Sequence, residues 1–407
     1  MAIRDGTPRL LRSLNDRAAL DLLLERGPLS RGQLGELTGL SKPTASQLLA
    51  RLEDAGLVVH GGRSSGRPGP GAQLYEINPT AAYVAALDVT PTRIRSAVAD
   101  LTGRMVGEYE LRTPRRKGSD AVAQVCAAVD GAVEDSGIAR SRLRRLVVGT
   151  PGAFDPRTER LRYARHLPGW HRPELLSRLA DALSVPFGID NDVNLAAVAE
   201  QHAGRARGHP SFVLLWAEDG LGAAIVINGA LHRGATGGAG EVGFLPLPET
   251  PVVRQVGRSN AGGFQALAGG PQVLELARGF GLRASSPEAA VARALTTPGA
   301  GDQLLHALAH RIALGLASIV SVIDPELVVL TGSVLRAGGD RLLDLVRAEL
   351  ADLAVARPTI ELSGIADRPV LQGGLYVALS AARDEVFDTI QSNSGGRQDL
   401  TPTPHRR

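Results

Sequence analysis

Two acids and two amides lie within five consecutive residues near the middle of the chain: Asp190, Asn191, Asp192 and Asn194. A carboxylate such as that of Asp192 can take a proton from a substrate hydroxyl, or it can simply accept a hydrogen bond from one. The first use belongs to an enzyme and the second to a sensor. An ordinary helix N-cap stays open as the alternative, because Asp and Asn are preferred caps. Capping needs one such residue, however, and here there are four.

The residues on either side of this cluster indicate how it is held. Residues 185–189 predict a buried strand, and residues 195–202 predict a helix. In an α/β sheet, ligands bind outside the carboxyl ends of the strands and close to helix N-termini. The cluster is therefore the candidate ligand site.

Length and composition bound the class of protein. The chain has 407 residues, of which 43% are hydrophobic, so two or three globular domains are expected. No run of about 18 apolar residues is found, so no membrane span is expected. The amino terminus lacks the apolar core of a signal peptide, and a cytoplasmic location is predicted.

The single cysteine, Cys126, excludes an internal disulfide and a cysteine-based zinc site. It lies in an Ala/Val helical pattern and is expected to be a small buried hydrophobe. The net charge is +3, and Lys42 and Lys117 are the only lysines. Abundant arginine alone is weak support for nucleic-acid binding, so the position of each cation has to decide.

The first eighty residues predict a winged helix. A helical apolar pattern over residues 18–24 is followed by two further helices, which Ser30 and Ser41 cap, with Pro43 in the first turn of the second. A glycine turn between two short helices is typical of a helix-turn-helix. Predicted strands at residues 57–60 and 73–77 enclose a Gly/Arg loop, which forms the wing. A small helical domain with a glycine-rich linker is the alternative, but the caps, turn and wing agree with one another.

The exposed polar residues of this unit suit phosphates and base edges of the major groove, and an arginine between glycine and proline suits a narrow minor groove. The predicted DNA-binding residues are Ser30, Arg31, Ser41, Lys42, Thr44, Ser46, Gln47, Arg63 and Arg67.

The remaining residues read as two similar lobes with a cleft between them. Each lobe has an antiparallel meander that leads into αβ units. Strands are predicted at residues 83–88, 93–100, 105–111, 146–149, 160–163, 211–216, 223–227 and 326–330. Helices are predicted at residues 121–133, 174–183, 304–322, 342–350 and 371–387. The predicted domains are a winged helix at 13–80, an effector domain at 81–386 (lobes at 81–200 and 201–370, closing helix 371–386) and a disordered tail at 388–407.

Two motifs carry a resemblance to a known family. Residues 221–234 (Leu-Gly-Ala-Ala-Ile-Val-Ile-Asn-Gly-Ala-Leu-His-Arg-Gly) and 240–243 (Gly-Glu-Val-Gly) are similar to the signature of the ROK family of repressors and sugar kinases. The winged-helix pattern resembles the transcription-factor branch of that family, and the likeness covers roughly residues 13–386. It implies an α/β fold in which a winged helix-turn-helix precedes a two-lobed, ribonuclease-H-like domain.

The resemblance also implies roles for site residues. In the family kinases, the aspartate that matches Asp192 deprotonates the sugar hydroxyl. Gly152, Asn191 and Glu241 fall at sugar-contact positions, and His166 stands where the family usually has an asparagine. These five residues are the predicted sugar-binding set.

Departures from the family pattern argue against catalysis. The kinases' Asp-x-Gly-Gly-Thr phosphate turn is Asp-Val-Thr-Pro-Thr at residues 88–92, and Pro91 has no N–H to offer a phosphate. The second phosphate loop, usually Gly-Thr-Gly, is Glu-Asp-Gly at residues 218–220, and its carboxylates would repel a triphosphate. The adenosine-side glycine pair is reduced to Thr-Gly-Ser at residues 331–333.

The family's structural zinc site is not expected either. Phe244 replaces its histidine, and residues 251–263 contain no cysteine. We therefore predict no metal, no cofactor and no enzyme activity. The loss of a sugar-contacting histidine also places effector affinity in question.

Three functions remain to be weighed. The first is a DNA-binding regulator of sugar genes, in which a sugar or sugar derivative shifts a homodimer, or a dimer of dimers, on a palindromic operator of double-stranded DNA. The second is an ATP-dependent sugar kinase with an appended DNA-binding domain. The third is a regulator that has lost sugar sensing. The departures favour the first.

Overall fold

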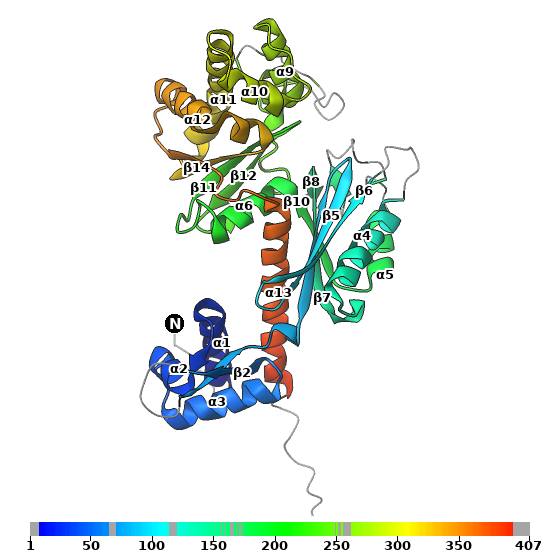
Figure 1. The fold of residues 1–407 in the computed structure, drawn as a ribbon, viewed down its shortest axis with the longest axis vertical. Coiled ribbons are helices and arrows are strands. Elements are labelled where there is room, and N and C mark those ends of the chain that lie inside the picture. The colour runs from blue at the N-terminus through cyan, green and yellow to red at the C-terminus, as the bar shows by residue number, and fades with distance from the viewer. Residues whose placement is uncertain are drawn as a thin grey trace, which may run out of the picture.

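The computed structural model describes residues 8–64, 71–113, 120–155, 157–158, 160–162, 167, 169–170, 172, 174–248, 250, 254 and 262–393. Three units follow one another along the long axis of the molecule: an amino-terminal helical unit and two α/β lobes (Figure 1). One long helix near the carboxyl terminus, α13 (Pro369–Asn393), runs beside the first lobe and down to the amino-terminal unit.

The amino-terminal unit is a winged helix. Its elements are α1 (Pro8–Arg26), β1 (Leu29–Ser30), α2 (Arg31–Thr38), α3 (Lys42–Asp54), β2 (Val58–Arg63) and β3 (Gln73–Ile77). The predicted caps are confirmed: Ser30 forms a capping box with Gln33, and Ser41 caps α3 with Pro43 in the first turn. Leucines of all three helices, among them Leu20, Leu34 and Leu48, form the core.

The first lobe has one five-stranded sheet with the order β10-β7-β4-β5-β6. Its elements are η1 (Pro79–Ala81), β4 (Tyr83–Val89), β5 (Arg93–Asp100), β6 (Met105–Arg112), α4 (Ala121–Ser136), η2 (Arg140–Arg142), β7 (Leu143–Thr150), β8 (Ala153–Asp155), β9 (Arg160–Arg162), α5 (Leu175–Leu183) and β10 (Phe187–Asn191). Helices α4 and α5 cover one face of the sheet, and α13 packs on the other.

The second lobe repeats this plan. Its elements are β11 (Phe212–Ala217), β12 (Leu221–Ile227), β13 (Ala230–Leu231), η3 (Val242–Phe244), α8 (Phe264–Ala268), α9 (Gly270–Gly279), α10 (Pro287–Leu295), α11 (Ala300–Ile323), β14 (Leu327–Thr331), α12 (Ser333–Leu353) and β15 (Thr359–Leu362). When the strands are counted from the first strand of each lobe, both sheets have the order 3-2-1-4-5. The predicted Asn228-Gly229 hairpin is confirmed, because both residues have positive φ.

Helix α6 (Asp192–Ala203) lies between the two lobes. Its Leu195 packs with α13 and the first sheet, whereas Val193 and Ala196 pack against the second sheet. The end of β10 and the first turn of α6 together carry the acid and amide cluster. The candidate site therefore sits where the lobes meet.

Several sequence predictions need correction. The strand that precedes the cluster ends at Asn191 and α6 begins at Asp192, so the cluster is not an open turn between elements. Helix α13 continues to Asn393 and thus includes residues 388–393, which were assigned to the tail. Helices α8 to α10 were missed, because frequent glycines and prolines interrupt their pattern.

One helix within the described ranges, α11, is long and apolar enough by length and composition to cross a membrane. Its buried residues, including Leu308, Ile312 and Leu316, form the centre of the second lobe's core. Packing in a globular core accounts for its composition.

Candidate functional site: acidic residues at the lobe junction and an exposed polar helix

Asn191 is the N-cap of α6. Its Oδ1 accepts hydrogen bonds from the backbone N–H groups of Val193 (2.8 Å) and Asn194 (3.2 Å). Its Nδ2 donates to the carbonyl of Gly152 at 3.1 Å. The capping alternative therefore holds for Asn191, which keeps only part of its hydrogen-bonding capacity for a ligand.

Asp190 joins the two lobes. One carboxylate oxygen accepts hydrogen bonds from Arg233 Nη2 (2.6 Å) and Nε (3.2 Å), which come from the second lobe. The other oxygen accepts from the Asn191 N–H and from Asn194 Nδ2. With four donors around it, this carboxylate is structural, and it fastens the loop after β13 to the end of β10.

Asp192 differs from Asp190 in its surroundings. Its carboxylate accepts one hydrogen bond, from the Val193 N–H at 2.8 Å, and meets no cation among the described residues. Burial raises the pKa of Asp192 to about 7, and the neighbouring carboxylate of Asp88 adds to the rise. Asp192 thus has an acceptor group that the protein itself does not satisfy.

Three further carboxylates surround Asp192: Asp88 from the first lobe, and Glu218 and Glu241 from the second, all of which act on its pKa. Burial raises the pKa of Glu241 to about 7. Burial also raises the pKa of Asp88 to about 6, against the opposing charges of Arg93 and Arg95. Both lobes therefore bring acceptors to one place at their junction, where a polyol could donate hydroxyl hydrogen bonds to them.

Glu218 lies at the N-terminus of α12. Burial raises its pKa, and a hydrogen bond from the Ser333 backbone N–H acts in the opposite direction. A helix N-terminus is where a phosphate would otherwise bind. The protein's own carboxylate already uses this donor.

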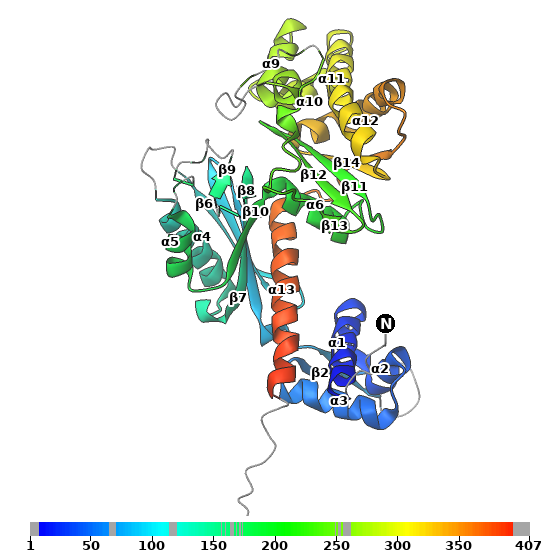
Figure 2. The same cartoon turned by 180° about the vertical axis from the view of Figure 1, so that it is seen from behind.

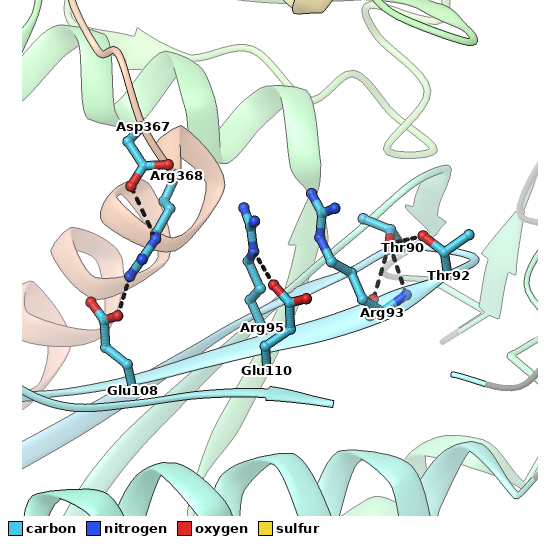
Figure 3. Close-up of polar contacts among 8 residues, drawn as sticks. All are labelled: Thr90, Thr92, Arg93, Arg95, Glu108, Glu110, Asp367 and Arg368. Atoms are coloured by element: carbon cyan, nitrogen blue, oxygen red, sulfur yellow. Dashed lines mark hydrogen bonds and ion pairs between the residues drawn. The ribbon is translucent and has the colours of Figure 1, made fainter. Parts of the chain in front are cut away.

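The turn after β4 is closed by its own hydrogen bonds (Figure 3). The Thr90 hydroxyl donates to the Arg93 carbonyl at 3.0 Å and accepts from the Arg93 N–H at 3.2 Å. The Thr90 N–H also donates to the Arg93 carbonyl, at 2.9 Å. Beyond the turn, Arg95 pairs with Glu110, so its charge is shared between that partner and Asp88.

The predicted sugar-binding residues are only partly accounted for. The structure brings Asn191 and Gly152 into contact and places the Asp192 and Glu241 carboxylates near each other. His166 lies outside the described residues, and no contact with a sugar is tested for any of the five. Sequence reasoning missed the pairing of Asp190 with Arg233, for which it held no signal.

The recognition helix α3 presents a polar face. Lys42, Thr44 and Gln47 are exposed, while Ala45, Leu48 and Leu49 face the core. This is the arrangement in which a helix can enter a major groove with its polar residues outward.

Three predicted DNA-contacting serines already have internal partners. The Ser30 hydroxyl caps α2, and the Ser41 hydroxyl lies 2.8 Å from that of Thr44. The Ser46 hydroxyl accepts from Arg31 Nη1 and donates to the Lys42 carbonyl. Arg63 is exposed at the end of β2, and Arg67 lies outside the described residues. The DNA contacts of all these residues stay predictions. The side chains of Lys42 and Gln47 are the least engaged in contacts within the protein.

Replacing Asp192 with asparagine should stabilise the unliganded protein near pH 7.5. A carboxyl group whose pKa rises from 3.8 to about 7 on folding binds more protons in the folded state. Stability is therefore lost as pH rises from about 4 to 7, by about 1.4 kcal/mol per pH unit for one such group. Thermal melts between pH 5 and 8 should show a weaker pH dependence for Asp192→Asn than for the wild type.

Asp190→Asn is the matched control for this measurement. It should lower Tm at neutral pH, because it removes the charged partner of Arg233. Equal effects of the two substitutions on thermal stability would mean that the Asp192 carboxylate does not destabilise the folded protein at neutral pH.

Known proteins resemble both the winged-helix unit and the two lobes of this chain. Two family models match the chain: the ROK family over residues 84–374 and the MarR family over residues 13–67. The xylose repressor of Bacillus subtilis (strain 168) is 22% identical over 351 residues, which cover 86% of this chain and 89% of that protein.

Solved structures also resemble this chain. A ROK family transcriptional regulator, a homologue of the Escherichia coli MLC protein, matches with a TM-score of 0.74 at 17% identity and covers 94% of this chain and 99% of that one. The ROK hexokinase from Thermus thermophilus has a TM-score of 0.62 at 27% identity and covers 74% of this chain and 99% of its own. The regulator spans the winged helix as well as the lobes.

Proposed function

Because the chain belongs to the ROK family and its amino-terminal residues match the MarR family, we propose that it is a sugar-responsive, DNA-binding transcriptional repressor. The observation that carries this proposal is the presence, in one chain, of an exposed polar helix in a winged-helix unit and a group of buried carboxylates from both lobes around Asp192. The similarity to the xylose repressor of Bacillus subtilis (strain 168) supports it.

In this proposal the sugar lies in the cleft beside α6. Asp192 and Glu241 accept hydrogen bonds from its hydroxyls, which removes part of the cost of holding two partly unsatisfied carboxylates close together. Gly152 has φ +96°, so this position favours glycine and lets the loop approach a ligand closely. Asn191 and His166 complete the proposed set.

The sugar acts by shifting a population of conformations. A ligand that contacts both lobes favours the arrangement in which both sets of acceptors reach it, and it can shift the equilibrium only by its difference in affinity for the two arrangements. We propose a homodimer, or a dimer of dimers, on a palindromic operator in the cytoplasm. The proposed boundary between the DNA-binding and effector domains lies between residues 80 and 81.

A kinase activity is not part of this proposal. Pro91 offers no N–H to a phosphate, the Thr90 hydroxyl is engaged with Arg93, and Glu218 occupies the N-terminus of α12. A triphosphate at this place would meet the carboxylates of Glu218 and Asp88.

Incubation with labelled ATP and a panel of hexoses, pentoses and N-acetylated sugars is expected to give no phosphorylated sugar. The physical reasons are the missing N–H at Pro91 in the first phosphate turn and the carboxylates of Glu218 and Asp219 in the second, which would repel a triphosphate. The ROK hexokinase from Thermus thermophilus serves as the positive control under the same conditions. Clear phosphorylation of a sugar by the purified protein would contradict this expectation and support the sugar-kinase alternative.

One substitution favours a second candidate, a regulator that does not bind a sugar. Phe244 stands where the family pattern has a histidine, which the resemblance implies to be a sugar contact. Calorimetry with free and phosphorylated sugars discriminates between the two. Binding of at least one sugar, lost in Asp192→Asn, supports the sensor, and no binding of any supports the alternative.

The DNA-binding half is tested without knowledge of the effector. Random or genomic DNA fragments retained by the purified protein should converge on an inverted repeat with half-sites about one or two helical turns apart. Recovery of fragments with no common sequence would contradict a specific operator.

A further inference from the structure

Helix α13 contacts α6, the sheet of the first lobe and the winged helix. It is 25 residues long, which corresponds to about 37 Å. In both views it extends from the junction of the lobes to the winged helix (Figures 1 and 2). No other helix in the described ranges makes this connection.

The upper end of α13 is seated directly on α6. A Cβ at Gly373 would lie 1.8 Å from the backbone carbonyl oxygen of Leu195, and a Cβ at Gly374 would lie 2.9 Å from the side chain of Ala86. The two helices therefore touch through their backbones, one turn after Asp192. Since such a contact has no flexible side chain in between, a movement of the first turn of α6 has to move α13 as well.

The lower end of α13 is anchored in the winged helix. Phe387 is buried, 4% exposed, in the same core as Leu20 and Leu23 of α1. The guanidinium of Arg17 lies 5.2 Å from the centre of the Phe387 ring, and its Nη1 lies 2.7 Å from Asp384 Oδ1. One arginine of α1 thus holds two residues, one turn apart, of α13.

At this same lower end, α13 is also tied to the rim of the first lobe. Arg383 donates from Nε (3.2 Å) and Nη2 (2.9 Å) to the carbonyl of Leu101, which itself belongs to the winged-helix core. Arg145 pairs with Glu385 at 3.1 Å. The winged helix therefore rests on the first lobe through the last turns of α13.

We propose that α13 transmits the state of the cleft to the DNA-binding unit, and that the contact of Arg17 with Asp384 and Phe387 is the joint through which it does so. The inference rests on the proposed function for the nature of the signal, and on the backbone seat at Leu195 and the buried Phe387 for its route. A shift of α6 on sugar binding tilts α13, and the joint converts the tilt into a new orientation of α3. In a dimer, this changes the spacing of the two recognition helices.

The test uses the full-length protein with Arg17→Ala, Asp384→Ala and Phe387→Ala. Ser380→Ala, an exposed position on the same helix, is the matched control. Operator Kd is measured with and without xylose, glucose, N-acetylglucosamine and their phosphates, and sugar binding is measured separately by calorimetry. Loss of the joint should reduce a sugar response of fivefold or more to less than about twofold, while sugar affinity is unchanged. Arg17→Ala and Asp384→Ala change partly exposed side chains, so they remain informative if Phe387→Ala does not fold.

A second arm needs no sugar. Gly374→Ala forces a small separation between α13 and β4 at the cleft end. Hydrogen exchange of the amides of α1 should shift in Gly374→Ala and return to the wild-type rate when Asp384→Ala is added. An unchanged exchange of α1 in Gly374→Ala, or a full sugar response in the joint variants, overturns the inference. Failure of every sugar to act on the wild-type protein counts against the proposed function instead, and the exchange arm still decides on α13.

Discussion

Asp192→Asn is expected to abolish the sugar response of operator binding while operator affinity without sugar stays within about twofold of the wild type. Asparagine keeps the shape and the hydrogen bond from the Val193 N–H, but it removes the charge. A hydrogen bond to a charged group contributes about 1.5–3 kcal/mol, so sugar affinity should fall about 10- to 100-fold. Calorimetry for the sugar and fluorescence anisotropy for the operator measure the two effects separately.

Asp190→Asn again supplies the comparison. It breaks the contact with Arg233 and should weaken sugar binding together with thermal stability, because it loosens the junction of the lobes. If Asp192→Asn lost operator binding along with the sugar response, Asp192 would have to be a structural residue. The same stability gain predicted for Asp192→Asn at neutral pH would then be absent.

The combined substitution Lys42→Ala and Gln47→Ala is expected to produce the largest loss of operator binding. Lys42 is exposed at the first turn of α3, where it can reach a phosphate, and its loss should lower the salt dependence by about one counterion. Gln47 projects from the exposed face of α3 towards base edges, and its loss should cost about 1–3 kcal/mol and relax the preference at one base pair. Anisotropy titrations at several salt concentrations separate the two contributions.

Arg283→Ala is the charge-matched control, because Arg283 is exposed in the second lobe and its removal changes the net charge by the same amount. It should leave both affinity and salt slope unchanged. If it weakened binding as much as Lys42→Ala, the long-range field of the protein rather than α3 would carry the interaction.

Local sequence signals predicted the winged helix closely. Ser30 and Ser41 are caps in the structure, and the second strand of the wing has the predicted bounds at Gln73–Ile77. These features succeeded because each depends on residues within a few positions of one another: a side-chain oxygen and the N–H groups of the next turn, or a period of two in a short strand.

The roles of the two central aspartates could not be predicted in this way. Asp190 and Asp192 are equivalent in the sequence, and only the fold brings Arg233, 43 residues away, to one of them. The same holds for α13, whose apolar pattern predicted a helix but not its partner. Asp384 and Phe387 meet Arg17 from the opposite end of the chain, and the sequence carries no local trace of that contact.

A titration of sugars into the complex of the purified protein with the operator fragment recovered by selection tests whether Asp192 belongs to a sugar-sensing site. We expect that at least one sugar changes operator affinity by fivefold or more, and that Asp192→Asn removes the change while it leaves the complex intact. Operator affinity that no sugar alters, or an unaltered response in Asp192→Asn, would contradict a sugar-sensing cleft built around this residue.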